Sequence, residues 1–294
     1  MLDFKTPSIA DKELIEGYTR FCGQIGCDIS FANTYLWRDR YRIMTAFDSD
    51  TFYKCYAMGG RIRGYSLPIT KGDIRRAADN ILEDARERGI QPMIGLMNKS
   101  DAERLQSLYK DRLTAIREDR DAADYIYERE KLAQLAGKKY HAKRNHISRF
   151  ERSYPNHSFK ELCKDNFDDA FKVVGIWQDN NEDTGETAVI KDAFGHFEEL
   201  GMFGLVMYVG SDPVAMCMAS EINDRVCDVN FEKAVDLDGA YAMINREFAR
   251  RFDKYTLINR EEDMGVEGLR KAKLSYHPDI LYTKNYAVFK KESN

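Results

Sequence analysis

RVCDVNFEKAVDLDGAYAMINREFARRFDKYTLINREEDMGVEGLRKAKLSYH, residues 225–277, decides the predicted fold. A short apolar run ends at Phe231 and is followed by a polar turn over residues 236–239. Backbone N–H groups at the start of a helix can bind an anionic ligand, so a strand, a glycine turn and a helix in this order are typical of α/β ligand sites. The helix is indicated by apolar residues at every fourth position, which are Ala240, Ile244, Phe248 and Phe252.

The second half of this stretch again predicts a strand followed by a helix. Residues 255–258 form a strand-like run that leads into the charged cluster Asn-Arg-Glu-Glu-Asp at 259–263. A further helix is predicted over 266–275, and it must end before Pro278 because the residue preceding a proline is pushed out of the α conformation. The stretch therefore predicts an α/β fold, in which a strand delivers polar residues to one edge of a sheet.

Length and composition restrict the class of protein. At 294 residues the chain exceeds a usual single core, and its 43% hydrophobic and 32% charged residues are typical of an ordered globular protein. No run of 18 apolar residues is present, and the first residues do not read as a secretion signal. The six cysteines form no CxxC pair, which indicates reduced thiols, a cytoplasmic location and no zinc site. The net charge of −4 argues against a body that is basic throughout.

The order of predicted elements divides the chain into three parts. Residues 1–130 contain helices, a hairpin, a helix, a strand, a helix and a strand, which predicts one compact α/β domain. Residues 131–155 predict a basic linking helix, and residues 156–294 repeat the element order of the first part. We therefore expect two domains, each with its own mixed sheet flanked by helices.

The segment 131–155 has an unusual excess of positive charge. Apolar residues at helical spacing give the predicted helix one buried face. Its basic residues are Lys138, Lys139, Lys143, Arg144, Arg149 and Arg152. Two interpretations stay open: a solvated surface that joins two domains, or a site for phosphate groups of a tRNA, a lipid head or a nucleotide.

Several segments carry a resemblance to known families. The predicted elements follow the order of the GNAT acyltransferase fold, which is two helices, a hairpin, a strand, a glycine turn, a helix, a strand, a helix and a strand. Residues 137–147, 239–245 and 258–278 resemble a bacterial family related to the C-terminal domain of phosphatidylglycerol lysyltransferases. The resemblance implies two tandem GNAT-like (acyl-CoA N-acyltransferase) domains. Fem-type aminoacyltransferases, which take their acyl group from aminoacyl-tRNA, have this arrangement.

One departure from the family pattern bears on the donor. Acetyl-CoA-dependent members bind pyrophosphate through Gln/Arg-x-x-Gly-x-Gly/Ala, and the matching positions here begin with Asp236 and Asp238. Of that motif Gly239 is kept, Ala240 follows it, and Tyr241 fills a position for a small residue. Carboxylates would repel a pyrophosphate, so this loop favours an aminoacyl-tRNA donor, or no catalysis, over coenzyme A. Gly239, Ala240 and Tyr241 are the donor-binding positions that the resemblance implies.

Acyl transfer to an amine needs a base and donors for the developing oxyanion, and the cluster at 259–263 supplies candidates. Glu261 or Glu262 could act as base or hold an ammonium group, and Arg260 could contact an anion. Glu232 leaves the neighbouring predicted strand at the same edge. The alternative is that these carboxylates cap the next helix, where negative charge is favourable.

Three further basic residues are candidates for phosphate binding. Lys273 occupies the place of a lysine seen in Fem-like proteins, and Lys143 and Arg144 lie in the basic segment. His141 and His146 are five positions apart rather than four, so no metal site is expected.

The sequence thus predicts an acyl or aminoacyl transferase of the GNAT/Fem-like superfamily. Its acceptor would be an amine or hydroxyl on a small molecule or a peptide, and its donor aminoacyl-tRNA or acyl-CoA, with no resident cofactor. Two alternatives stay open: a non-catalytic protein that binds a ligand or RNA on the same fold, and an acetyl-CoA-dependent N-acetyltransferase. The oligomeric state does not follow from the sequence.

Overall fold

The computed structural model describes residues 1–181 and 185–291. Its contacts divide the chain into two compact units that are each discontinuous in sequence. Unit 1 contains Met1–Asp124, Glu262–Val266 and the residues from Leu281 onward, and unit 2 contains Tyr125–Glu261 and Glu267–Ile280. The functional domains expected at 1–130 and 156–294 stay a prediction.

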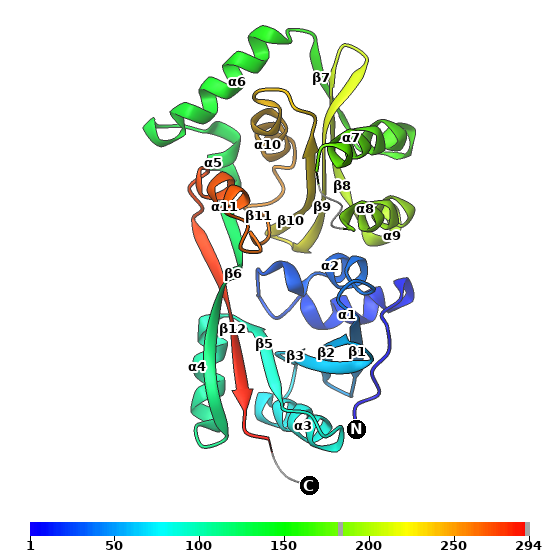
Figure 1. Cartoon of the computed structure of the whole chain (residues 1–294), viewed down its shortest axis with the longest axis vertical. Coiled ribbons are helices and arrows are strands. Elements are labelled where there is room, and N and C mark those ends of the chain that lie inside the picture. Colours follow the sequence, from blue (N-terminus) through cyan, green and yellow to red (C-terminus); the bar gives the residue numbers. More distant parts are fainter. Residues whose placement is uncertain (182–184, 292–294) are drawn as a thin grey trace. The chain divides into compact units, whose positions relative to one another are not determined.

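Unit 1 is a mixed sheet with helices on both faces (Figure 1). Its strands follow the order β1-β2-β3-β5-β12-β6, in which β3 and β5 run parallel while β1 with β2, β2 with β3, and β5 with β12 run antiparallel. Its helices are α1 (Lys12–Thr19), α2 (Phe31–Leu36), α3 (Ile74–Glu87) and α4 (Lys99–Tyr109), with the short turns η1 (Ile9–Asp11) and η2 (Cys27–Ile29). Its strands are β1 (Ile43–Phe47), β2 (Thr51–Met58), β3 (Arg61–Ser66), β4 (Ile69–Thr70), β5 (Met93–Met97), residues 113–124 of β6 (Leu113–Glu128) and residues 281–289 of β12 (Ile280–Phe289).

Strand β2 shows how the sequence assigns the two faces of this sheet. Successive side chains of a strand point to opposite faces. Tyr53 and Cys55 pack into a core with α3 and α4, whereas Phe52 contacts Tyr18 of α1 on the other face. Lys54 points to the same face as Phe52 and is 4% exposed, so a charged side chain is buried beneath the first two helices. That buried lysine borders the polar cluster described below.

Unit 2 has the same plan. Its strands follow the order β6-β11-β10-β9-β8-β7, in which β10 and β11 run parallel. Helix α10 covers one face of this sheet, and α7 and α8 cover the other (Figure 1). The helices are α5 (Arg129–Gln134), α6 (His141–Ser153), α7 (Phe167–Asp179), α8 (Glu186–Gly195), α9 (Phe197–Leu200), α10 (Ala240–Arg251) and α11 (Glu267–Leu274), with the turns η3 (Lys138–Tyr140) and η4 (Lys164–Asn166). The strands are β7 (His157–Glu161), β8 (Phe203–Val209), β9 (Asp212–Asn223), β10 (Val226–Ala234), β11 (Leu257–Asn259) and residues 125–128 of β6.

The basic segment is not one continuous helix. Helix α5 ends at Gln134, and α6 begins at His141 after the short turn η3. Leu135 has φ +49° and Gly137 has φ +87°, and a left-handed backbone cannot continue a right-handed helix. The linking helix expected over 131–155 is therefore shorter than predicted, and α6 carries Lys143, Arg144 and Arg149.

Each unit contains a parallel strand pair joined by a helix, β3–α3–β5 in unit 1 and β10–α10–β11 in unit 2. Along the chain, the order expected for a GNAT-like domain occurs twice, with paired helices, a hairpin, then strand, helix, strand, helix and strand, but the last strand of the second run, β12, lies almost wholly in unit 1. The predicted α/β fold class, with a mixed sheet flanked by helices, is confirmed; the expectation that each domain has a sheet of its own is not, because the strands form one 12-stranded sheet. Among the described residues no helix is both long and apolar enough to span a bilayer.

Candidate functional site

The predicted site residues Glu232 and Arg260 meet in unit 2. Strands β10 and β11 pair in parallel with Cys227 opposite Ile258, so the residues beyond them leave from neighbouring strands. The Arg260 Nη2 donates to Glu232 Oε1 at 2.7 Å, and the two side chains are 12% and 10% exposed. Asn245 of α10 donates to the other Glu232 oxygen at 3.3 Å. One carboxylate is therefore held between a guanidinium and an amide.

This pair leaves two polar atoms unused. Among the described residues, Arg260 Nη1 and Asn245 Oδ1 are buried without a hydrogen-bond partner. Burial by itself lowers the pKa of Arg260, but the Glu232 carboxylate raises it above its usual value. An unused buried donor and an unused buried acceptor are each costly, by roughly 1–3 kcal/mol. Arrangements of this kind are concentrated at functional sites, which makes the cluster a candidate site.

Lys143 joins this cluster from α6. Its Nζ lies 3.7 Å from the ring centroid of Tyr276, and the Arg260 Cζ lies 5.0 Å from the same centroid. Burial lowers the pKa of Lys143 to about 8, and the neighbouring Arg260 charge lowers it further than Glu232 raises it. The Lys143 side chain is only half-buried. A partly accessible amine with a pKa of about 8 is partly neutral near neutral pH and can accept a proton.

Two other predicted residues support the turn that carries Arg260. Lys273 of α11 donates its Nζ to the backbone carbonyls of Arg260 at 2.6 Å and Glu261 at 3.2 Å. The Glu261 backbone has φ +55°, and its N–H donates to the Asn259 side chain at 2.7 Å. A non-glycine residue in this conformation is strained, so the lysine and the asparagine stabilise a turn that would otherwise relax. In this structure the Lys273 ammonium contacts backbone, and its role as a phosphate ligand stays a prediction.

The predicted donor loop at the start of α10 is covered by α6. Gly239 has φ +91°, and a Cβ at this position would lie 2.5 Å from the His146 carbonyl oxygen. The N–H of the buried Ala240 already donates within the turn, to Leu237 at 3.0 Å. Tyr241 is 42% exposed. Helix α6 thus approaches Gly239 closely, and the Ala240 N–H is already used within the turn, which leaves little room for a pyrophosphate at these two positions.

The acidic residue of that loop is neutralised rather than repulsive. Asp238 Oδ1 lies 2.8 Å from His146 Nδ1, and its Oδ2 lies 3.1 Å from the Arg149 guanidinium. The hydrogen bond from His146 lowers the pKa of Asp238, and the Arg149 charge adds to this effect. The physical reason to expect poor coenzyme A binding is therefore the close approach of α6, more than the carboxylate itself.

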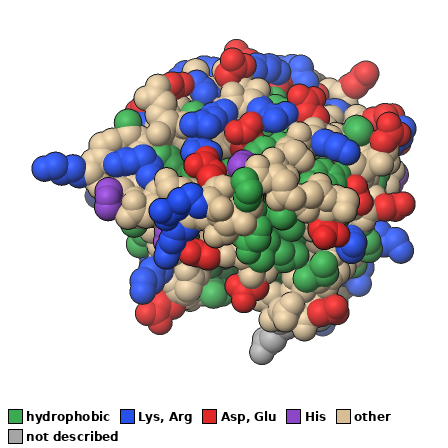
Figure 2. All heavy atoms as spheres, turned by 90° about the horizontal axis from the view of Figure 1, so that it is seen from above, with side chains coloured by type: hydrophobic (Ala, Val, Ile, Leu, Met, Phe, Trp, Pro, Cys, Tyr) green, Lys and Arg blue, Asp and Glu red, His purple; other side chains and the backbone are tan. Residues whose placement is uncertain are grey.

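The outer face of α6 remains exposed. Figure 2 looks down on the end of unit 2 that carries α6 and shows Lys, Arg and His side chains gathered on one side of that face. Arg149 is half exposed, and Lys138 and Lys139 are exposed. Arg144 differs, because its guanidinium donates to the carbonyls of residues 135 and 137 at 2.5 and 2.7 Å and so stabilises the break before α6.

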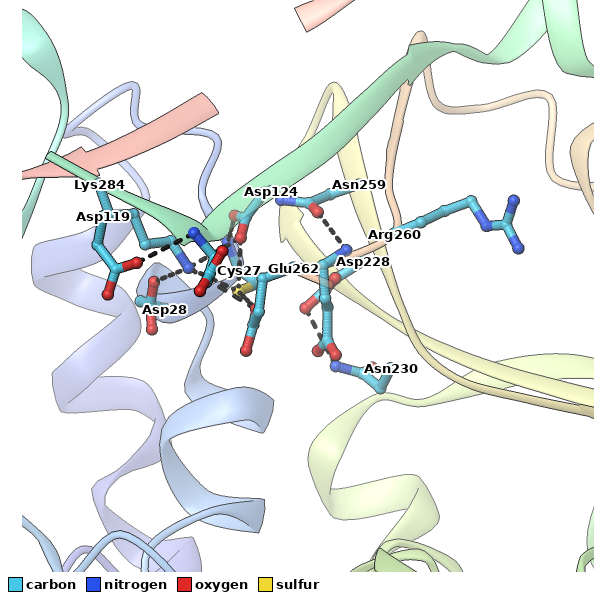
Figure 3. Close-up of polar contacts among 12 residues, drawn as sticks. Cys27, Asp28, Asp119, Asp124, Asp228, Asn230, Asn259, Arg260, Glu262 and Lys284 are labelled. Atoms are coloured by element: carbon cyan, nitrogen blue, oxygen red, sulfur yellow. Dashed lines mark hydrogen bonds and ion pairs between the residues drawn. The ribbon is translucent and has the colours of Figure 1, made fainter. Parts of the chain in front are cut away.

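Glu262 lies in unit 1, within a separate buried cluster (Figure 3). Lys284 of β12 is its centre: the ammonium lies 2.5 Å from Asp28, 2.8 Å from Asp124 and 3.9 Å from Glu262. Cys27 donates its backbone N–H to Asp124 at 2.8 Å. Burial raises the pKa of Glu262, whereas the carboxylates raise the pKa of Lys284 well above its usual value although burial lowers it. The site carboxylates predicted together, Glu232 and Glu262, thus belong to different units.

The same cluster is the set of described residues that could offer metal ligands. Donor atoms of Cys27, Asp124 and Glu262 lie within 4.8 Å of one another. The Lys284 ammonium, however, lies 3.4 Å from the Cys27 sulfur and already supplies the positive charge there. Burial also raises the pKa of the Cys27 thiol, which disfavours the thiolate that a metal would need. The residues present fit an internal ion pair better than a metal centre.

Sequence reasoning missed several of these residues. Asn245 lies within an amphipathic helix and looks like one of its polar residues, while Asp124 and Lys284 lie within strand-like runs. A charged residue in a strand that is otherwise apolar is the signal that could have found Asp124 and Lys284, because such residues are rarely buried without a partner. The partner itself, more than a hundred positions away, could not be read from the pattern.

Comparisons with known proteins agree with this fold. The family described as "Phosphatidylglycerol lysyltransferase, C-terminal" matches residues 19–289. A conserved protein of unknown function from Bacteroides thetaiotaomicron is 36% identical, with a TM-score of 0.92 over 99% of this chain and 100% of that one. L-PGS from Bacillus licheniformis is 15% identical, with a TM-score of 0.68 over 96% of this chain and 93% of that one, which shows a shared fold.

A more distant relative extends the comparison. A protein of Mycoplasmoides gallisepticum described as uncharacterised is 23% identical over 203 residues. The match takes in 63% of this chain and spans 65% of the length of that relative.

Proposed function

This chain belongs to the family of the C-terminal region of phosphatidylglycerol lysyltransferases, and we propose that it transfers an aminoacyl group from aminoacyl-tRNA to an amine or hydroxyl acceptor. The observation that carries this proposal is the environment of Lys143, a half-buried amine whose pKa is about 8. General bases work best when their pKa lies near the working pH. The family and the fold support a transferase, and Lys143 supplies the group that such a reaction requires.

The proposed step begins with the neutral Lys143 amine. It accepts the proton from the acceptor N–H or O–H while the acceptor nitrogen or oxygen attacks the ester carbonyl carbon. The carbon–oxygen bond to the tRNA ribose then breaks, and the ribose oxygen takes up the proton that Lys143 accepted, which regenerates the neutral amine. Burial and the Arg260 charge lower the pKa of Lys143 to about 8, and Glu232 holds Arg260 in place at 2.7 Å. In this account Arg260 and Glu232 are positioning residues.

The choice of donor follows from α6 and α10. Helix α6 approaches the start of α10 so closely that a Cβ on Gly239 would lie 2.5 Å from a backbone oxygen. That supports a donor that does not place a pyrophosphate there. Exposed basic residues on and before α6 could instead contact the phosphates of a tRNA. The ester carbonyl and the tRNA phosphates would then both lie against α6, because Lys143 is on that helix.

The test measures transfer directly. The full chain would be incubated with radiolabelled lysyl-tRNA and separate acceptors: phosphatidylglycerol vesicles, a peptide with a free amine, and buffer alone. We expect labelled product with one acceptor, and about 100-fold or more slower transfer after Lys143→Met. The control is Lys110→Met, an exposed lysine outside the basic segment that should transfer at the parental rate. Tight tRNA binding without transfer to any acceptor would contradict an enzyme and favour a binding protein.

A further inference from the structure

Lys143 combines a side chain that solvent can reach with an amine whose pKa is lowered. The pKa of Lys143 and the pKa of Lys54 are both lowered, in each case chiefly by burial. Lys54 is 4% exposed and its Nζ donates to the Asp28 carbonyl, so reagents do not reach it. Lys143 is half-buried, and Lys138 is exposed.

Burial is the main cause of the lowered pKa of Lys143, and the charges around the amine add to it. The Lys143 Nζ and the Arg260 guanidinium both lie over the ring of Tyr276, at 3.7 and 5.0 Å from its centroid. The charged groups that act on Lys143 are Arg260, beyond β11, and Glu232 of β10. Glu232 is already bound to Arg260 at 2.7 Å and to Asn245 at 3.3 Å. Two cations therefore share one carboxylate, and the more accessible of the two is the lysine.

We propose that Lys143 is a modification site, at which small activated acyl groups acylate the Nζ in preference to neighbouring exposed lysines. The reagents are of one chemical class, acyl phosphates and activated acyl esters or thioesters. In a second step of the inference, which rests on the proposed function, acylation turns transfer off because an amide nitrogen accepts no proton.

The chemistry of the step is balanced without a further reactant. The lone pair of the neutral Nζ attacks the acyl carbonyl carbon and forms a nitrogen–carbon bond. The bond from that carbon to the phosphate, alcohol or thiol then breaks, and the leaving group departs with the electron pair. The nitrogen releases one proton to solvent or to the leaving group. The product is an uncharged amide, so Lys143 loses its charge and its cation–π contact with Tyr276.

The test follows the pH dependence of labelling. The full chain would be treated briefly with acetyl phosphate at pH 7.5 and pH 9.5, and acetylation at Lys143 and Lys138 would be measured by mass spectrometry after Glu-C digestion. With a pKa of about 8, roughly a quarter of Lys143 is neutral at pH 7.5, against about one in a thousand for an ordinary lysine. Lys143 should therefore be labelled faster at pH 7.5.

The ratio of the two labelling rates is the decisive quantity. Between pH 7.5 and pH 9.5 the neutral fraction of an ordinary exposed lysine rises far more than that of Lys143, so the ratio of the labelling rate at Lys143 to that at the exposed control lysine should fall about 20-fold. This fall does not depend on how exposed each amine is. A ratio that stays constant with pH, or slower labelling of Lys143 at pH 7.5, would overturn the proposal.

Preferential labelling of Lys143 and the loss of transfer on acetylation can be tested independently. Preferential labelling by a chain that transfers no aminoacyl group would support the modification site while the proposed function fails. In a chain that does transfer, the activity should fall in proportion to the fraction of Lys143 acetylated. Transfer that is unchanged at full acetylation would overturn the switch.

Discussion

Two buried lysines in the two units have opposite electrostatic environments. Lys284 in unit 1 is 3% exposed and lies within 2.8 Å of both Asp28 and Asp124. Lys143 in unit 2 is half-buried and has an arginine as its nearest strong charge, with the single carboxylate Glu232 already bound to that arginine. The carboxylates raise the pKa of Lys284, whereas burial and Arg260 lower that of Lys143.

Because of this difference, Lys284 is expected to contribute to stability and Lys143 to the reaction. A lysine held between carboxylates stays charged at every physiological pH, so it can neutralise a core but cannot accept a proton. A lysine near a second cation exists partly as the free amine, which is the form that reacts. Each unit contains a parallel strand pair joined by a helix, yet the proposed reaction uses residues of unit 2. The predictions below test that division.

The largest expected effect is on stability in unit 1. Lys284→Met leaves Asp124, which is fully buried, without its cation. Removing one partner of a buried ion pair costs about 3–5 kcal/mol, so urea unfolding should show a loss of that order. Lys290→Met is the control, because this exposed lysine near the same end of the chain should change the unfolding free energy by at most about 0.5 kcal/mol. A loss below about 1 kcal/mol for Lys284→Met would mean that the cluster is not a structural ion pair.

Lys143→Met should have the opposite profile. We expect the unfolding free energy to change by less than about 1 kcal/mol, because the side chain is partly solvated, while transfer falls about 100-fold. The base must be neutral, so the rate of the parental chain should rise with pH up to the pKa of about 8 and then level off. A parental rate that is flat from pH 6 to pH 9 would contradict Lys143 as the base.

The packing of α6 can be tested with two glycines. Gly239 and Gly137 both have positive φ, but a Cβ on Gly239 meets the His146 carbonyl at 2.5 Å, whereas a Cβ on Gly137 meets nothing within 4 Å. Gly137→Ala should cost about 1–3 kcal/mol from backbone strain alone, because φ 87° with ψ 172° is a conformation almost confined to glycine. Gly239→Ala should cost about 1–3 kcal/mol more, because α6 must shift. Equal losses in chemical unfolding would show that α6 does not seal the start of α10.

Much of the fold could be predicted from the sequence, because it depends on local periodicity. The helix from Ala240 and the strands around it follow from apolar spacing and one glycine turn. The parallel pairing of β10 with β11 places Glu232 and Arg260 on neighbouring strands, which the element order already implied. Local patterns carry this information since each depends on residues a few positions apart.

The environment of individual side chains could not be predicted in this way. Lys143 was recognisable as one basic residue among six, but its contact with Tyr276 joins positions far apart in the chain. Glu261 and Glu262 are adjacent in sequence, yet the division between the units falls between them. A pKa depends on burial and on charges brought together by the fold, and neither is a property of a short stretch.

The smallest expected effect concerns tRNA. Arg144 holds backbone carbonyls, so Lys138 and Arg152 are better substitutions for testing the exposed basic face. The double alanine variant should bind tRNA a few-fold more weakly and should flatten the dependence of log affinity on log salt by about 1–2 units. The control pair, Lys110 and Arg61 of unit 1, should leave the salt slope unchanged. A gel shift at two salt concentrations in which both pairs behave alike would favour a solvated surface.

The titration of Lys143 tests the central claim most directly. In the chain labelled with [13C]lysine, the Cε resonance of Lys143 can be assigned by its loss in Lys143→Arg and followed from pH 6 to pH 11. The account predicts a midpoint at about 8, well below the value near 10.4 of an ordinary lysine. A midpoint at or above 10 would show that Lys143 is charged at physiological pH, and would remove the base from the proposed reaction.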